Sequence, residues 1–203
     1  MRAAAIPAII AALLTVASCQ GSPFGGPDPI GKPNIDLDRW RLEVLFHSRR
    51  LCEFSYDDLT GLPHIEVSTC LVRRDNTGAC GTFGGVPLDV ILERCAQGIK
   101  ADRVVFVSAN GYESSMSVAE IKNDWIVALT VNGKRLTRDE GFPARMVIPG
   151  RYDYKWVRWL KSIVLIRGDH FGFWEFIGED QSGRVPRHIF RRVEREWKAH
   201  HKP

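Results

Sequence analysis

The chain lacks a dense run of basic residues, although it carries a slight excess of positive charge. Its 28 Lys and Arg residues are spread along 203 positions and are nearly balanced by 24 Asp and Glu, which gives a formal charge of +4. Proteins that bind nucleic acid usually gather their basic residues on one stripe or helix. The scattered charge therefore argues against nucleic acid as a partner. The hydrophobic content of 44% is typical of one globular domain with short extensions.

The chain also lacks an internal repeat and a Cys-x-x-Cys motif. A zinc site is therefore weakly supported. Apart from one cysteine near the N-terminus, the cysteines are Cys52, Cys70, Cys80 and Cys95, at irregular spacings. Outside the cytoplasm such thiols can form disulfides. The spacing leaves the connectivity open.

The apolar run at the N-terminus is too short to span a bilayer comfortably. Residues 3–16 are apolar, follow Met1-Arg2, and end at small residues directly before Cys19. This arrangement looks like a bacterial lipobox. It predicts a lipoprotein signal peptide over 1–18, lipidation of Cys19 and a flexible, lipidated tether over 19–37, which would hold the protein at the membrane on the periplasmic side of the bacterial cell envelope. The alternative is an ordinary signal peptide with an incidental cysteine.

Alternation of apolar and polar residues predicts several short strands. The predicted strands are 40–46, 64–70, 103–108, 125–131, 145–148 and 157–166. The predicted helices are a short one capped by Ser55 and Asp58, one over 86–95, a short one over 116–123 and an amphipathic one over 187–200. Polar and glycine-rich residues predict a long loop over 71–85. Strands outnumber helices, so we expect an α+β fold with mixed or antiparallel sheets.

The stretch from Asn132 to Leu160 crowds glycine, proline, cationic and aromatic residues between two apolar runs. It begins with Asn-Gly, which is a hairpin-turn signal. Glycine lets a backbone approach a ligand closely, and arginine donates to phosphate from a rigid fork. The candidates for binding an anion are Arg145, Arg151, Lys155 and Arg158.

Several segments together resemble the molybdopterin-binding oxidoreductase domain of the sulfite oxidase family, which includes the catalytic subunit of the protein-methionine-sulfoxide reductase. They are DRWRLEV at 38–44, FSYDDLTGLP at 54–63, GGVPLDVIL at 84–92, VVFVSANGYESSMSV at 104–118, the stretch 128–163 and GFWEFIG at 172–178. Each segment alone is a weak signal, whereas the combination is specific. The resemblance implies a sulfite-oxidase-like domain over 38–180, followed by a basic C-terminal helix and tail over 181–203.

By this resemblance, one cysteine thiolate at a strand end ligates molybdenum and takes part in catalysis. Cys70 has the matching position ahead of the Gly-Val-Pro-Leu segment, and thiolate is a suitable soft ligand. The alternative is that Cys70 forms a disulfide with Cys80 or another cysteine, and Cys80 is the second choice as ligand. The family commonly places Gly-Asn after this cysteine, whereas Leu71 to Arg74 follow it here.

The resemblance also implies a set of donors for the polar rings and phosphate of the cofactor. The implied cofactor-binding residues are Ser108, Arg145, Lys155, Trp156, Val157 and Arg158. Backbone amides and cations at such positions would suit a phosphate. The alternative for Arg145 is a surface ion pair with Asp139 or Glu140. The alternative for Lys155 and Arg158 is a solvated strand face.

Two functions follow from the resemblance. The first is a lipid-anchored oxidoreductase that uses Mo-molybdopterin to transfer an oxygen atom or two electrons, with a small oxyanion or sulfoxide-type substrate. Its electron-transfer partner would be external, because the chain shows no second redox motif. The second is a cofactor-free binding or accessory lipoprotein on the same fold. We expect the family's long N-terminal segment and C-terminal dimerisation domain to be absent, which favours the second, whereas the retained cysteine favours the first.

Overall fold

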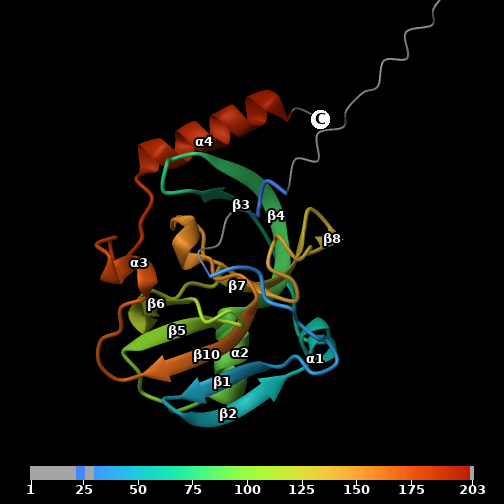
Figure 1. Ribbon diagram of the computed structural model, residues 1–203, viewed down its shortest axis with the longest axis vertical. Coiled ribbons are helices and arrows are strands. Elements are labelled where there is room, and N and C mark those ends of the chain that lie inside the picture. The colour runs from blue at the N-terminus through green and yellow to red at the C-terminus, as the bar shows by residue number, and fades with distance from the viewer. Residues whose placement is uncertain (1–21, 26–29, 202–203) are drawn as a thin grey trace, which may run out of the picture.

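The computed structural model describes residues 22–25 and 30–201, which form two five-stranded sheets with short helices (Figure 1). The α+β class and the mixed sheets expected from the sequence are confirmed. The predicted signal peptide and the predicted lipidation site, Cys19, lie outside the described residues.

The first sheet has the strand order β2-β1-β10-β5-β6. Its strands are β1 (Leu42–Phe46), β2 (Arg49–Phe54), β5 (Arg103–Ser108), β6 (Glu113–Ser117) and β10 (Leu160–Ile166). β1 pairs with β10 in parallel, and the other neighbours are antiparallel. The parallel pair therefore joins an early and a late part of the domain within one sheet.

The second sheet has the order β3-β4-β7-β8, and β9 also pairs with β7. Its strands are β3 (Ile65–Val72), β4 (Gly78–Pro87), β7 (Ile126–Val131), β8 (Lys134–Arg135) and β9 (Arg145–Val147), and all pairs are antiparallel. Figure 1 shows the β3–β4 hairpin rising away from the first sheet, with α4 (Arg187–His200) across its far end. The far end of the hairpin thus packs with α4 at one end of the molecule, while the rest of β4 pairs with β7.

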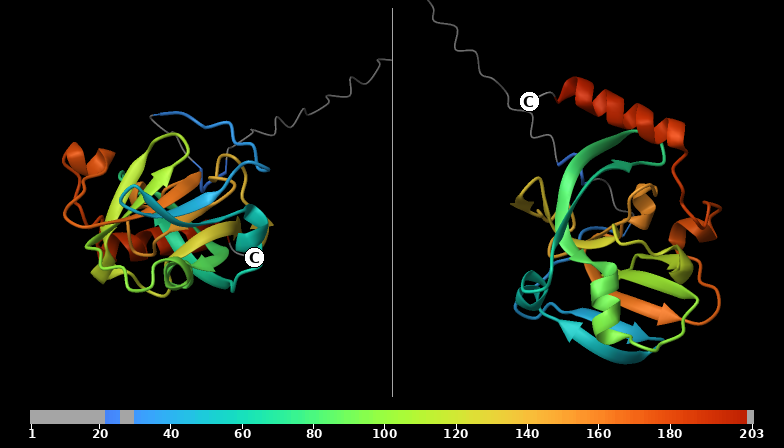
Figure 2. Two further views of the ribbon diagram at one scale, coloured as in Figure 1. Left: turned by 90° about the horizontal axis from the view of Figure 1, so that it is seen from below. Right: turned by 180° about the vertical axis from the view of Figure 1, so that it is seen from behind.

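The other helical segments are short and lie at the ends of strands. They are α1 (Tyr56–Thr60), α2 (Leu88–Cys95), η1 (Val118–Glu120), η2 (Asp153–Lys155) and α3 (Phe173–Phe176). The predicted cap of α1 is confirmed, since Ser55 Oγ accepts from the amide of Asp58 and the carboxylate of Asp58 accepts from the amide of Ser55. The view from behind in Figure 2 shows β4 curving from α4 down to α2.

Most buried apolar side chains form one core that both sheets share. A smaller cluster lies under α4, where Val193 packs with Cys70 and Val72. This contact confirms the predicted amphipathic helix, because Ile189 and Phe190 of the same face pack against this cluster.

The prediction of a long loop over 71–85 is wrong, because most of these residues belong to the β3–β4 hairpin. A glycine-rich sequence is typical of a loop, but here the glycines let β4 fit between β3 and β7. A Cβ atom at Gly85 would lie only 2.1 Å from the carbonyl oxygen of Val127. Glycine in β4 therefore serves the close approach of two backbones rather than a turn.

The predicted helix over 116–123 is also wrong in extent. β6 continues to Ser117, and only the single 3-10 turn of η1 follows. The sequence patterns also failed to identify β2 as a strand. It lies at the edge of its sheet and begins with two exposed arginines, so it lacks the alternation that marks the other strands.

Candidate functional site

Arg145 lies at the start of β9 and is buried, with 1% of its surface exposed. Its Nη1 donates to the carbonyl oxygens of Phe24 at 2.8 Å and of Glu140 at 3.0 Å. Its guanidinium carbon lies 5.8 Å from the ring centre of Trp156 and 6.0 Å from that of Phe83. Arg145 is therefore a buried cation held by backbone carbonyl groups between aromatic rings, and the alternative of a surface ion pair is wrong.

Two hydrogen-bond donors at this place are buried and have no partner among the described residues. They are Nε of Arg145 and Nε1 of Trp156. An unpaired buried donor normally costs about 1–3 kcal/mol, so neighbouring examples call for an acceptor. The donor set, one cationic and one neutral, fits an anionic group such as a phosphate.

The charges of Arg73 and Arg158 act on Arg145. We call these three residues the arginine cluster. Burial first, and then the charge of Arg158, lower the pKa of Arg145 to about 9. The guanidinium is thus still protonated at pH 7. Since its positive neighbours disfavour its charge, a bound anion would relieve the repulsion within the arginine cluster.

Asp153 in η2 partly balances the arginine cluster. Burial raises the pKa of its carboxyl group, whereas the charges of Arg73, Arg145 and Arg158 lower it. The charge of Glu140 also acts on Arg145, so two carboxyl groups face three guanidinium groups, and the site keeps an excess of cations.

Residues 22–25 lie over the arginine cluster. Arg73 Nη2 donates to the carbonyl oxygens of Pro23 at 2.6 Å and Gly25 at 3.4 Å. The phenyl ring of Phe24 is 3% exposed and packs edge-on against Phe83, with ring centres 5.3 Å apart. The prediction of a flexible tether is therefore wrong for these four residues, which are fixed by the same arginines that form the candidate site.

Arg158, the third residue of the arginine cluster, lies just before the start of β10. Its Nη1 donates to the carbonyl oxygen of Asp139 at 3.2 Å, and its guanidinium lies over the ring of Trp159. A Cβ atom at Gly141, where φ is +106°, would lie 2.9 Å from Cβ of Arg158. The solvated strand face considered for Arg158 is not what the structure shows.

Lys155 is not brought to the arginine cluster. Its Nζ is fully buried, forms an ion pair with Glu175, and donates to the carbonyl oxygen of Ser115 at 3.0 Å. Burial lowers the pKa of Lys155, and the charge of Glu175 opposes that shift. Its solvated alternative is also wrong, because the lysine binds a residue of the GFWEFIG segment instead.

Three other predicted residues have local structural roles. Ser108 Oγ accepts from the amide of Asn110 at 3.4 Å, and the carbonyl oxygen of Val157 accepts from the amide of Met146 at 2.8 Å. Arg151 forms an ion pair with Glu120 at 3.0 Å. Of the predicted residues, the structure thus brings together Arg145, Trp156 and Arg158.

Cys70 forms a disulfide with Cys80, its direct partner across the β3–β4 hairpin. Cys52 forms a second disulfide with Cys95. A sulfur in a disulfide is not a thiolate, so neither Cys70 nor the second choice, Cys80, is a metal ligand in this redox state. The alternative of a Cys70–Cys80 disulfide is confirmed, and ligation by Cys70 stays a prediction that requires reduction.

The sequence patterns missed four residues that shape these sites: Phe24, Arg73, Asp153 and Glu175. Arg73 follows Cys70 closely, but the sequence marks it only as one of the residues that replace the family's Gly-Asn. Glu175 could have been suspected, because a buried lysine needs a carboxylate partner. Phe24 gave no signal, since a single aromatic residue among glycine and proline is typical of a linker.

Within residues 22–25 and 30–201, no group of three or more His, Cys, Asp or Glu side chains is arranged to hold a metal ion. No helix in the described part of the chain is both long and apolar enough to cross a membrane.

The sequence matches the family described as "Oxidoreductase molybdopterin binding domain" over residues 30–174. An inducible NADH nitrate reductase of Glycine max is 32% identical over 167 residues, which covers 66% of this chain and 19% of that protein. The uncharacterized oxidoreductase YuiH of Bacillus subtilis (strain 168) is 27% identical over 155 residues, which covers 73% of this chain and 76% of that protein. This chain thus spans about a fifth of the nitrate reductase that it matches.

A similar solved structure is that of the sulfane dehydrogenase SoxCD from Paracoccus pantotrophus. Its TM-score is 0.62 at 20% identity, over 68% of this chain and 41% of that chain, so it supports the fold alone. The resemblance drawn from the sequence motifs is confirmed by the family match, whose description names the same ligand, a molybdopterin. Since the match covers well over half of its residues, the chain belongs to the oxidoreductase molybdopterin-binding domain family.

Proposed function

We propose that this domain binds the phosphate end of a molybdopterin at the arginine cluster and acts as an oxidoreductase. The observation that carries the proposal is the pair of buried, unpaired donors, Arg145 Nε and Trp156 Nε1, beside further guanidinium groups. A phosphate has several oxygens and can accept from cationic and neutral donors at once. Buried donors without a partner also lie elsewhere among the described residues, such as Trp40 Nε1 and Arg103 Nε, so the proposal rests on two such donors lying together beside further guanidinium groups.

Each residue of the site has a separate part in this proposal. Arg145 presents its fork to the phosphate, Arg158 adds a second charge, and Trp156 donates through its indole nitrogen. The ring of Phe24 covers the site and excludes water, which strengthens the electrostatic attraction. Asp153 lowers the net positive charge in the absence of an anion.

The reaction is an oxygen-atom or two-electron transfer on a small oxyanion or sulfoxide-type substrate. Molybdenum in a bound cofactor supplies this redox chemistry, and the protein supplies binding and orientation. The name of one relative, a nitrate reductase, is consistent with an oxyanion as the substrate. The electrons would pass to or from an external partner.

The remaining parts of the proposal are the metal ligand and the location of the protein. Cys70 is the proposed molybdenum ligand, in its reduced state. The protein is a lipoprotein held by Cys19 on the periplasmic side of the cell envelope, which is supported by the small residues that precede that cysteine.

A second candidate function is a cofactor-free binding or accessory protein on the same fold. Two observations favour it. Cys70 is bonded to Cys80, and the carbonyl oxygens of residues 23–25 already accept from Arg73 and Arg145. On this view, residues 22–25 have replaced the ligand of the arginine cluster.

Replacing Arg158 with alanine tests the first function. In protein purified from a host that makes molybdopterin, we expect Arg158→Ala to lose bound pterin about tenfold faster on dialysis, because one charge-assisted contact is removed. Pterin is measured by its fluorescence after release with acid. The control is Arg167→Ala, which removes an exposed arginine over Phe46 in the first sheet. If both variants retain pterin like the wild type, the phosphate assignment is wrong.

A further inference from the structure

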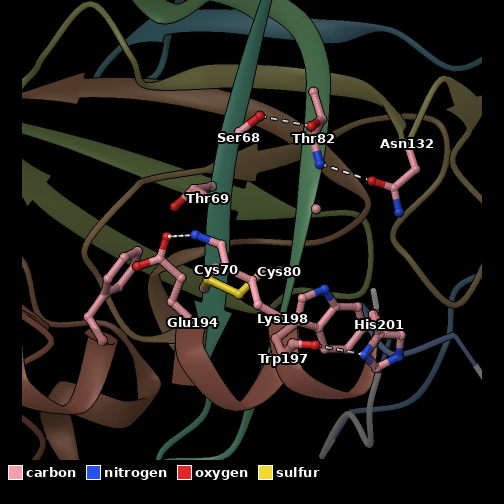
Figure 3. Close-up of a pocket in the computed structure, with 12 residues that line it drawn as sticks. Ser68, Thr69, Cys70, Cys80, Thr82, Asn132, Glu194, Trp197, Lys198 and His201 are labelled. Carbon is pink, nitrogen blue, oxygen red and sulfur yellow. Dashed lines mark hydrogen bonds and ion pairs between the residues drawn. A yellow bond between two sulfur atoms is a disulfide. The ribbon is translucent and has the colours of Figure 1, made fainter. Parts of the chain in front are cut away.

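The Cys70–Cys80 disulfide lies in the wall of a pocket of about 530 Å³ between the β3–β4 hairpin and α4 (Figure 3). Cys80 is half-buried, whereas Cys70 is only 2% exposed. Exchange of a disulfide requires that a thiolate reach one of its two sulfurs. Both cysteines line the pocket, and the more exposed Cys80 is the more accessible of the two to an incoming thiol.

The Cys52–Cys95 disulfide, which joins β2 to the end of α2, provides an internal comparison. It also lines a pocket, and that pocket has an excess of negative charge. Its charged residues are Glu53, Asp57, Asp58 and Arg94. An approaching thiolate is an anion, so these carboxylates repel it.

The pocket beside Cys80 has a different charge. Lys198 and His201 line it together with a single carboxylate, Glu194, which pairs with Lys198 at 2.8 Å. Figure 3 shows this pair on α4 close to the disulfide. Because Lys198 offsets the charge of Glu194, this pocket repels an approaching thiolate less than the acidic one does, and it suits an exchange reaction better.

The hairpin does not depend on the disulfide for its shape. β3 and β4 are joined by a ladder of eight residue pairs, from Ile65 opposite Gly85 to Val72 opposite Gly78. Val193 of α4 packs against Val72 of the hairpin as well as against Cys70, so part of this contact does not involve the S–S bond. Reduction of Cys70–Cys80 is therefore compatible with a folded domain.

We infer that the Cys70–Cys80 disulfide is a site of thiol–disulfide exchange and that its substrate is a dithiol. One thiolate of the dithiol bonds to Sγ of Cys80, the Cys70–Cys80 bond breaks, and Cys70 leaves as a thiolate. The second thiolate of the dithiol then bonds to the first sulfur of the dithiol. The mixed disulfide with Cys80 breaks, and Cys80 leaves as a thiolate. The dithiol is oxidised to a disulfide, its two electrons reduce the cysteine pair, and its two protons pass to the cysteines or to solvent.

This exchange deepens the proposed function and in that respect rests on it. The oxidised form holds the sulfur of Cys70 in a bond, and the reduced form makes it available as a soft ligand. The exchange would thus decide whether the domain can hold metal, whereas the arginine cluster would bind the pterin phosphate in either state.

Titration with dithiothreitol under native conditions tests the exchange. After each step, free thiols are alkylated and located by peptide mass spectrometry. We expect Cys70 and Cys80 to be labelled at a dithiothreitol concentration about tenfold lower than Cys52 and Cys95, with an unchanged near-ultraviolet circular dichroism spectrum. If both pairs open together, if the order is reversed, or if tertiary structure is lost first, the inference is overturned.

The point of attack and the role of charge are tested separately. A monothiol, glutathione, should give a mixed disulfide on Cys80, and a mixed disulfide on Cys70 would contradict the access argument. Lys198→Glu should slow the opening at least severalfold because it makes the pocket acidic. The control Lys161→Glu introduces the same change at an exposed position on β10 and should have no effect.

The same samples separate this inference from the proposed function. Pterin and molybdenum are quantified alongside the labelled thiols. Selective opening in a protein that binds no pterin supports the exchange and overturns the proposed function. Bound pterin in a protein whose two disulfides open together supports the proposed function and overturns the exchange.

Discussion

Lys155→Met is expected to lower the free energy of unfolding by about 3–5 kcal/mol, because it leaves the carboxylate of Glu175 buried without its cation. The side chains of this ion pair are 0% and 1% exposed. The neutral hydroxyl of Ser114, which donates to Oε1 of Glu175 at 3.2 Å, would remain, and Oε2 lacks a partner among the described residues. Urea unfolding followed by circular dichroism measures the change.

The double variant Lys155→Met/Glu175→Leu separates the cost of breaking the pair from its net contribution. Replacing both charges with apolar groups of similar volume should recover most of the lost stability. The control Lys198→Met removes one partner of an exposed pair and should change stability by less than about 1 kcal/mol. A loss below about 1 kcal/mol in Lys155→Met would show that the pair is not buried as described.

The Lys155–Glu175 pair also predicts the direction of a pH effect. Burial lowers the pKa of Lys155 below 10.5 in the folded protein. Between the lowered pKa and 10.5 the unfolded chain binds more protons than the folded one, so this group makes stability rise with pH across that window. The rise should be missing from Lys155→Met.

Arg145→Lys is expected to weaken the binding of pyrophosphate, a simple probe of the phosphate site, by about tenfold or more. The variant keeps the positive charge but loses the planar fork and the unpaired Nε donor. A lysine could also not donate to the carbonyl oxygens of Phe24 and Glu140 in the same geometry. Isothermal titration calorimetry measures the affinity.

Arg135→Lys provides the matched control for Arg145→Lys. Arg135 is an exposed arginine whose guanidinium carbon lies 4.3 Å from the ring centre of Phe142, outside the arginine cluster. This variant should bind pyrophosphate like the wild type. Equal affinities of Arg145→Lys and the wild type would mean that charge alone, rather than the fork, holds the anion.

The strands that alternate cleanly and the amphipathic C-terminal helix could be predicted from the sequence, because their side-chain periods report which face is buried. The glycine-rich strand β4 could not. Its glycines are needed because β4 lies between β3 and β7. Local sequence patterns do not show this position, because it depends on the tertiary structure. The prediction of a loop over 71–85 also left the Cys70–Cys80 pairing open, because only the hairpin register places these residues opposite each other.

The candidate site shows a similar limit. Arg145 and Lys155 lie in one stretch of basic residues, and the sequence offered no reason to separate them. In the structure, Arg145 keeps an unpaired donor at the arginine cluster, whereas Lys155 turns to Glu175, twenty positions further along the chain. A basic residue becomes a candidate for ligand binding only when the groups that could neutralise it are known.

Binding of molybdopterin by the wild-type chain is tested most directly by its pterin content. The full chain is produced in a host that makes the cofactor, and the pterin released by acid is quantified per chain by fluorescence. We expect close to one pterin per chain, and much less in Arg145→Lys. A wild-type protein that carries no pterin from such a host would contradict the cofactor role of the arginine cluster and favour the cofactor-free protein.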